Sequence, residues 1–144
     1  MLASELTRLG YAAVDADEQI AHWEIGPDGR RWMWDRGRLE RAIEQHAPGP
    51  LFVCGIAQNQ RDMLDLFDQV FLLSMDHATR IDRLTASADR GPALWEPIID
   101  GLPVFEAEMR EIGATVLDAR LSPSVLAADH SECASLTSRT RSAF

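Results

Sequence analysis

The chain has 144 residues and a mass of 16.0 kDa, which is enough for one domain with a hydrophobic core. Its hydrophobic share of 46% and charged share of 26% are typical of a globular protein rather than a disordered one. The net charge of -9 and the pI near 4.8 argue against a nucleic-acid binder, because such a protein needs a basic face for phosphates.

Hydrophobic periodicity predicts an alternation of helices and strands along the chain. The expected helices cover residues 2–9, 36–46, 58–67, 77–84, 93–100, 103–112 and 122–128. The expected strands cover residues 11–14, 51–54, 70–73 and 114–118. Strand–helix–strand units predict an α/β fold with a parallel sheet of about four strands and helices on both faces. We expect this domain to span residues 1–128 and a disordered tail to follow at 129–144.

The run Leu-Phe-Val-Cys at 51–54 is the centre of this prediction. It is apolar at every position, which indicates a strand buried on both faces, as in the interior of parallel sheets. Ligands in such folds bind at the carboxyl ends of the strands. We therefore expect any site to lie near Gly55, Ala57 and Asn59.

The segment between the first two strands is less clearly patterned. Residues 18–24 are expected to form a helical turn or two, and Gly-Pro-Asp-Gly at 26–29 predicts a turn. Residues 30–35 carry Trp32 and Trp34 at alternate positions. This stretch is either a short extended segment or the aromatic lining of a cleft.

Cysteines, termini and basic residues set further limits. Cys54 and Cys133 lie far apart in the chain, and we expect free thiols in a reducing compartment rather than a disulfide. No apolar run has the length of a membrane span, and the N-terminus lacks a signal-peptide pattern. We therefore expect a cytoplasmic protein without membrane contact. All 14 basic residues are Arg, and the sequence contains no Lys.

Four short motifs resemble those of small P-loop kinases. They are Val-Asp-Ala-Asp at 14–17, Val-Cys-Gly at 53–55 with Asn59, the run from Asp65 to Leu73, and Gly-Ala-Thr-Val-Leu-Asp-Ala at 113–119. The chain is similar to the shikimate-kinase-like and adenylate-kinase-like nucleoside kinases, in particular to actinobacterial kinase-like ATPases. The resemblance implies phosphoryl transfer from ATP, with Mg²⁺, to a nucleoside or another small hydroxyl compound.

The chain departs from this family at its N-terminal end. These kinases open with Gly-x-x-x-x-Gly-Lys-Ser/Thr, whose N–H groups cradle the phosphates while the Lys reaches the β- and γ-phosphates. The sequence starts within what would be the next helix, and without Lys it cannot carry this loop elsewhere. The planar fork of Arg does not replace a compact ammonium group. We therefore expect a degenerate or truncated kinase-like domain with little or no activity as written.

The missing segment should also affect the sheet. In shikimate-kinase-like sheets the first strand lies between the strands that match 51–56 and 70–73. Without it, we expect either that these strands pair directly, or that the domain is unstable and forms homo-oligomers through exposed strand edges.

Nine residues are candidates for the site, and the resemblance implies roles for most of them. Catalytic roles fall on Asp15, Asp17 and Arg83. The two aspartates would also hold Mg²⁺ through water or orient a substrate hydroxyl. Contacts to the small-molecule phosphate acceptor fall on Cys54, Gly55 and Asn59. Trp34 is a further candidate because tryptophan can stack on a base, although it more often belongs to the core or to a cleft wall. Contacts to ATP fall on Arg83, Arg90 and Asp118.

Each role has a structural alternative. The aspartate pair could be a helix N-cap and a first-turn acid. Cys54 and Gly55 could form a tight turn with a small buried thiol, and a nucleophilic cysteine is not expected because no partner His stands in a recognisable motif. The arginines could line a solvated helix face, and Asp118 could belong to an ordinary strand-end turn. For the whole chain, the alternatives are a non-catalytic domain that binds a small molecule or a partner, and an unrelated α/β domain with flavodoxin-like strand order.

Overall fold

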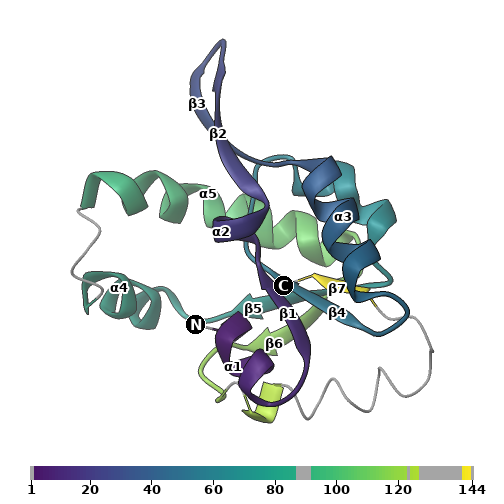
Figure 1. Cartoon of the computed structure of the whole chain (residues 1–144). Coiled ribbons are helices and arrows are strands. Elements are labelled where there is room, and N and C mark those ends of the chain that lie inside the picture. Colours follow the sequence, from purple (N-terminus) through teal and green to yellow (C-terminus); the bar gives the residue numbers. More distant parts are fainter. Residues whose placement is uncertain (1, 87–91, 123, 127–140, 144) are drawn as a thin grey trace. The chain divides into compact units, whose positions relative to one another are not determined.

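The computed structural model describes residues 2–86, 92–122, 124–126 and 141–143 (Figure 1). The chain divides into two compact units: unit 1 contains residues 1–70 and 122–144, and unit 2 contains residues 71–121. Apart from one antiparallel hairpin, the strand pairs within each unit are parallel. The predicted α/β class with parallel strands is therefore confirmed.

Unit 1 is built around β4 (Leu51–Cys54), whose four residues are all buried, as the apolar run predicts. β1 (Ala12–Asp15) pairs with one edge of β4, and β7 (Arg141–Ala143) pairs with the other edge. β7 also pairs with the first two residues of β5 (Gln69–Ser74). Within unit 1, β7 therefore lies between β4 and the start of β5 (Figure 1).

β7 corrects two expectations. It is a strand inside the segment 129–144, for which the sequence predicts a disordered tail; the rest of that segment lies outside the described residues. It also lies between the strands expected at 51–56 and 70–73. These strands therefore neither pair directly nor lack a neighbour at this edge. The reason is that buried strands need main-chain partners, and this partner comes from far along the chain.

The helices of unit 1 that pack in its first 70 residues are α1 (Leu2–Arg8), α2 (Ala16–Gln19), α3 (Arg36–His46) and the 3₁₀ helix η1 (Gln60–Leu66). α3 has the predicted bounds, whereas the helix predicted over 58–67 is shorter and of the tighter 3₁₀ type. Leu39 and Ile43 on the inner face of α3 pack with Val14 of β1 and Met63 of η1 in the main core cluster.

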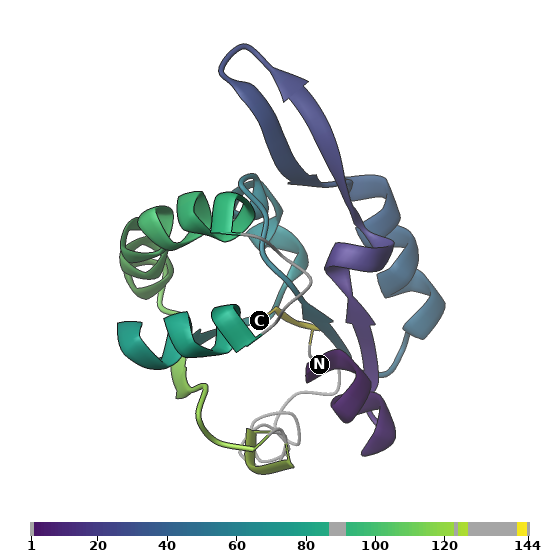
Figure 2. The same cartoon turned by 90° about the vertical axis from the view of Figure 1, so that its left-hand side faces the viewer.

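β2 (Ala21–Gly26) and β3 (Gly29–Trp34) form an antiparallel hairpin that extends away from the rest of unit 1 (Figure 2). The turn between them lies where the sequence predicts it. The helical turns predicted over 18–24 are wrong beyond α2, because Trp23 pairs with Trp32 across the turn and their ring centroids lie 4.9 Å apart. For residues 30–35 the extended alternative is confirmed.

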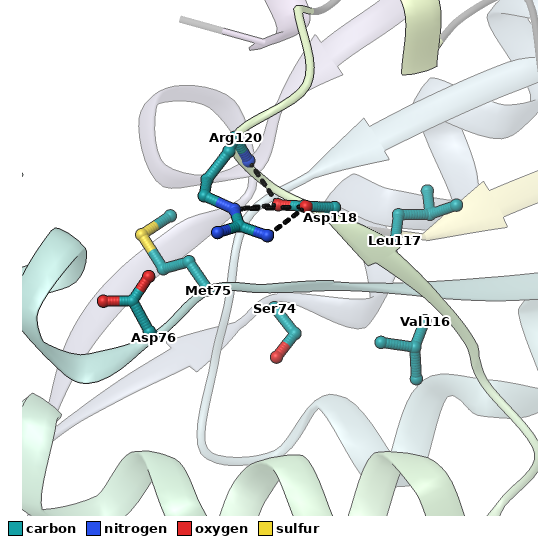
Figure 3. Close-up of a pocket in the computed structure, with 7 residues that line it drawn as sticks. All are labelled: Ser74, Met75, Asp76, Val116, Leu117, Asp118 and Arg120. Atoms are coloured by element: carbon teal, nitrogen blue, oxygen red, sulfur yellow. Dashed lines mark hydrogen bonds and ion pairs between the residues drawn. The ribbon is translucent and has the colours of Figure 1, made fainter.

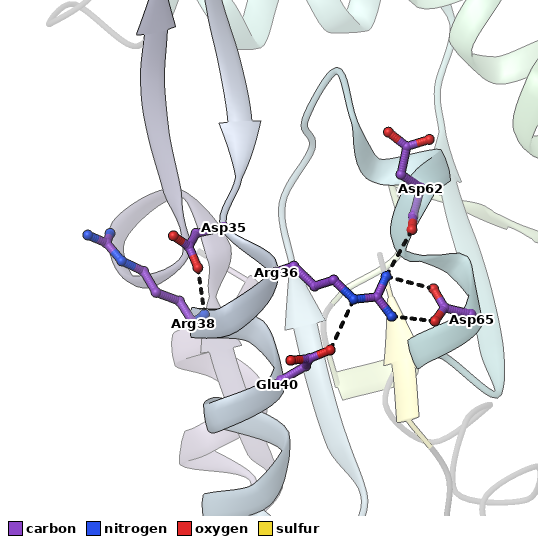
Figure 4. A network of polar contacts seen from close by, with 6 residues as sticks. All are labelled: Asp35, Arg36, Arg38, Glu40, Asp62 and Asp65. Carbon is purple, nitrogen blue, oxygen red and sulfur yellow. Dashed lines mark hydrogen bonds and ion pairs between the residues drawn. The ribbon is translucent and has the colours of Figure 1, made fainter.

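Arg36 links α3 to η1 (Figure 4). Its Nε donates to Glu40 at 3.0 Å, and its two terminal nitrogens contact both carboxylate oxygens of Asp65. Nη1 also donates to the carbonyl oxygen of Asp62 at 3.2 Å. These acceptors raise the pKa of Arg36 above its ordinary value. The network holds the segment that follows β4 against α3.

Unit 2 contains one parallel strand pair. The described part of the chain between these two strands includes two helices. Residues 71–74 of β5 pair with β6 (Thr115–Asp118). α4 (His77–Ala86) follows β5, and α5 (Pro92–Glu111) leads to β6. The strand predicted over 114–118 is therefore confirmed with one residue less.

Two helix predictions in unit 2 have different outcomes. Asp76 caps α4 as predicted, because its carboxylate accepts hydrogen bonds from the N–H and the hydroxyl of Thr79. The two helical pieces predicted over 93–100 and 103–112 form one continuous helix instead. Met109, 2% exposed, anchors the C-terminal part of this helix in the interior, and such packing can outweigh the missing N–H of Pro103.

Candidate functional site

The carboxyl ends of β1 and β4 bring Asp15, Asp17 and Gly55 together in unit 1. Asp15 and Cys54 are register partners at the ends of the two strands. Asp15 caps the short helix α2, because its Oδ1 accepts a hydrogen bond of 3.0 Å from the N–H of Asp17. The N-cap alternative for Asp15 is therefore confirmed. The cap also fixes Asp17 beside the strand ends.

Asp17 is connected to the hairpin through an aromatic side chain. The indole Nε1 of Trp32 donates to Oδ1 of Asp17 at 3.1 Å. Trp32 in turn contacts Trp23, which is 53% exposed and has the guanidinium of Arg30 4.8 Å above its ring. An exposed carboxylate thus lies next to a partly exposed aromatic pair, an arrangement that can offer both a hydrogen-bond acceptor and a flat apolar surface.

Gly55 is required at this edge for a steric reason. Its φ is +154°, and a Cβ added there would lie 2.8 Å from Cβ of Ala16 and 3.4 Å from Oδ1 of Asp17. No side chain fits in this space, so the backbone of Gly55 stays close to α2. The backbone of Gly55 therefore approaches α2 closely, and its approach to a ligand stays a prediction.

Cys54 does not have the properties of a nucleophile. It is 9% exposed, and burial together with the nearby charge of Asp15 raises the pKa of its thiol to about 12. Since the thiolate is the reactive form, this thiol is a small apolar core residue.

The side-chain amide of Asn59 bonds the main chain of Trp34 instead of facing the carboxyl ends of β1 and β4. The amide of Asn59 accepts a hydrogen bond of 2.8 Å from the N–H of Trp34 and donates one of 2.9 Å to its carbonyl oxygen. Trp34 is 2% exposed and lies in the core, and Trp32 is the tryptophan that contacts Asp17 near the strand ends. The alternation of a strand places Trp32 and Trp34 on one face, but the sequence does not tell which of them is deeper.

The strand ends of unit 2 form a pocket of about 300 Å³ (Figure 3). Its lining residues are Ser74, Met75, Asp76, Val116, Leu117, Asp118 and Arg120. Arg120 bonds Asp118 through Nε at 2.9 Å and Nη2 at 2.7 Å, and its backbone N–H adds a third bond of 2.9 Å. These bonds lower the pKa of Asp118 to about 2. The pocket therefore combines a fixed ion pair with apolar walls.

The predicted arginines have different outcomes. Arg83 on α4 donates to the carbonyl oxygen of Ala119 at 3.0 Å, directly after Asp118. The two predicted nucleotide contacts Arg83 and Asp118 therefore belong to the same region of unit 2. Arg80 pairs with Glu106 of α5 and has a structural role. Arg90 lies outside the described residues.

Of the pocket's lining residues, sequence reasoning named only Asp118 as a site residue, and Arg120 and Ser74 are two that it missed. Arg120 follows Asp118 at a spacing of two residues, and such a local pair after a strand could have been noticed. Ser74 ends β5 in register with Asp118, and only the pairing of the strands reveals this. The hydroxyl of Ser74 lies 3.4 Å from a carboxylate oxygen of Glu106.

The described side chains that could hold a metal ion are few. Among the described residues, no group of three or more His, Cys, Asp or Glu side chains is arranged to hold a metal ion. Asp15 and Asp17 supply two carboxylates, which suits Mg²⁺ because this ion keeps several waters and uses few protein ligands.

In the part of the chain that the structure covers, no helix is both long and apolar enough to cross a bilayer.

Comparisons with known proteins identify no relative. No protein-family model matches the chain, and neither the curated proteins nor the solved structures contain a match.

Proposed function

We propose that this chain is a P-loop-kinase-like domain, and that it binds a small hydroxyl-bearing molecule at the carboxyl edge of unit 1. The observation that carries the proposal is the strand order of unit 1. β7 lies between β4 and β5, where the kinases that the sequence resembles have their first strand. A parallel sheet of about four strands with helices on both faces remains part of this proposal.

The residues at the strand ends suit a phosphate acceptor. Asp15 and Asp17 would hold Mg²⁺ through water or orient a hydroxyl group, and the bare backbone of Gly55 lets a ligand approach closely. In unit 2, the pocket beside Asp118 and Arg83 is where the resemblance would put contacts to ATP. Mg²⁺ and ATP enter the proposal through the resemblance alone.

Phosphoryl transfer by this polypeptide is not part of the proposal. In P-loop kinases, catalysis consists mainly of positioning and of neutralising charge on the phosphates. The sequence has no Lys and no Gly-x-x-x-x-Gly-Lys motif for either task. We therefore expect no measurable phosphate transfer from Mg-ATP to any acceptor, while the acceptor still binds.

The strand order also bears on the alternatives. In the flavodoxin-like order 2-1-3-4-5 the last strand lies at the edge of the sheet, whereas β7 has a neighbour on each side. This difference disfavours the flavodoxin-like alternative.

NMR titration of the ¹⁵N-labelled chain tests the proposal. A panel of nucleosides and methyl glycosides, each with and without Mg²⁺, should shift the backbone amides of Asp17 and Gly55 with at least one compound. Asp17→Asn should weaken that binding, whereas Asp28→Asn, which removes an exposed acid in the hairpin turn, should not. The proposal fails if no compound in the panel shifts these amides.

A partner-binding role is a second candidate, and the hairpin favours it. Trp23 is 53% exposed and Ile25 is 92% exposed on one face of a two-stranded sheet. Exposed apolar side chains of this kind often mark contact surfaces. If the chain forms homo-oligomers through this hairpin, Ile25→Glu should lower the mass measured by light scattering at a fixed concentration.

A further inference from the structure

The edge of β4 that faces β7 needs a strand partner. All four residues of β4 are buried, with exposed fractions between 1% and 9%, so the strand is covered on both faces. β1 pairs with one edge over four residues, and only β7 covers the other edge among the described residues. Buried main-chain groups are stable only when they are paired. Any segment that pairs with this edge therefore contributes directly to keeping β4 folded.

The position between β4 and β5 is one strand wide. Ser142 is in register with Phe52 on one side and with Gln69 on the other. Ala143 is in register with Val53 and Val70 in the same way. The segment in this position is therefore bound through its main chain on both edges.

The segment that fills this position has little strand preference of its own. Its three residues are Arg, Ser and Ala, whereas strands are enriched in β-branched and aromatic residues. Main-chain pairing with β4 and β5 therefore accounts for its place better than its side chains do. This is the situation of β-augmentation, in which an extended peptide adds to a sheet through main-chain hydrogen bonds.

We propose that the gap between β4 and the start of β5 is a binding site for an extended peptide. Residues 141–143 of the chain occupy the site in this structure, and the same segment supplied as a separate peptide can occupy it in their place. The covalently attached segment has the advantage of a high effective concentration. A separate peptide should therefore bind only after the attached segment has been removed or disabled. This inference does not depend on the proposed function.

Hydrogen exchange of β4 in two altered chains tests the site. One chain ends at residue 140, and the other is the full chain with Ser142→Pro, which removes a main-chain donor from β7. In both, exchange at 51–54 should become about tenfold faster, the equivalent of one or two net main-chain hydrogen bonds. Ser142→Ala is the matched control and should leave the exchange unchanged.

Addition of peptides then separates a binding site from a merely structural strand. A peptide of residues 139–144 should slow the exchange at 51–54 in the shortened chain back to within about twofold of the full chain, in a saturable way. The same peptide with proline in place of Ser142 should have no effect. The proposal is overturned if exchange at 51–54 is unchanged by the deletion, if both peptides act alike, or if the shortened chain stays unfolded with the peptide present.

Discussion

Replacing Gly55 with alanine would put a Cβ 2.8 Å from Cβ of Ala16, which is fully buried at the start of α2. Overpacking of this kind costs about 1–3 kcal/mol. The φ of +154° adds a backbone cost of about 1 kcal/mol for a residue with a side chain. We therefore expect Gly55→Ala to lower the free energy of unfolding by about 2–4 kcal/mol, measured from urea denaturation at constant m-value.

Two further variants separate the steric cost from the backbone cost. Gly10 has a φ of +91° but nothing within 4 Å of an added Cβ, so Gly10→Ala should cost only about 1–2 kcal/mol. Ala16→Gly in the Gly55→Ala chain removes the methyl group that is struck, and a double-mutant cycle should show a favourable coupling of about 1 kcal/mol or more. If Gly55→Ala costs no more than Gly10→Ala, or if the coupling is absent, the close approach of β4 to α2 is refuted.

Three other measurements address the contacts of Asn59, Cys54 and Asp118. Asn59→Ala leaves the buried N–H and carbonyl groups of Trp34 unpaired and should cost about 2–5 kcal/mol by urea denaturation, whereas Asn59→Asp should recover only the N–H contact. With the other cysteine replaced by serine, a thiol reagent at pH 8 should modify Cys54 more than about a hundredfold faster in the unfolded chain, because the native pKa is about 12; equal rates would contradict its burial. Arg120 holds the pKa of Asp118 at about 2, below the unfolded value near 3.9, so its stabilisation is complete above about pH 5 and is lost progressively as the pH falls through 4 and 2. Asp118→Asn should therefore show a smaller loss of urea midpoint between pH 4 and 2 than the unaltered chain does, and equal losses would contradict the ion pair.

Elements with a strong local pattern were predictable from the sequence. α3 has the expected bounds because Leu39 and Ile43 recur at helical spacing and Asp35 caps the first turn. β4 was predictable because four consecutive apolar residues leave no polar face. In both cases the information lies within the element itself.

Elements that depend on distant partners were not predictable. β2 forms because residues 21–26 find β3 across a turn, while its own residues Glu24 and His22 give no strand signal. β7 is the extreme case, since three residues without strand preference become ordered through β4 and β5. Local propensity is weak in strands compared with the effect of neighbouring strands, so single-sequence reasoning fails at such positions.

The candidate site shows the same division. Asp15 and Gly55 were found because residues at the ends of buried strands are read directly from the strand pattern. Which of Trp32 and Trp34 lies in the core could not be foreseen, because depth along the hairpin depends on how Asn59 bonds the backbone of Trp34. A hydrogen bond between residues 25 positions apart leaves no trace in local sequence.

If the chain binds an acceptor as proposed, the arrangement of unit 1 predicts that this binding is separable from phosphate binding. The residues proposed for the acceptor follow β1 and β4, and they are fixed by contacts among themselves: Asp15 caps α2, Trp32 bonds Asp17, and Gly55 packs on Ala16. None of these contacts uses a phosphate loop. Preorganised groups of this kind bind a ligand without help from a second substrate. The affinity of the acceptor for this chain should therefore be the same with and without Mg-ATP, and a strong dependence on the nucleotide would show that the two sites are not independent.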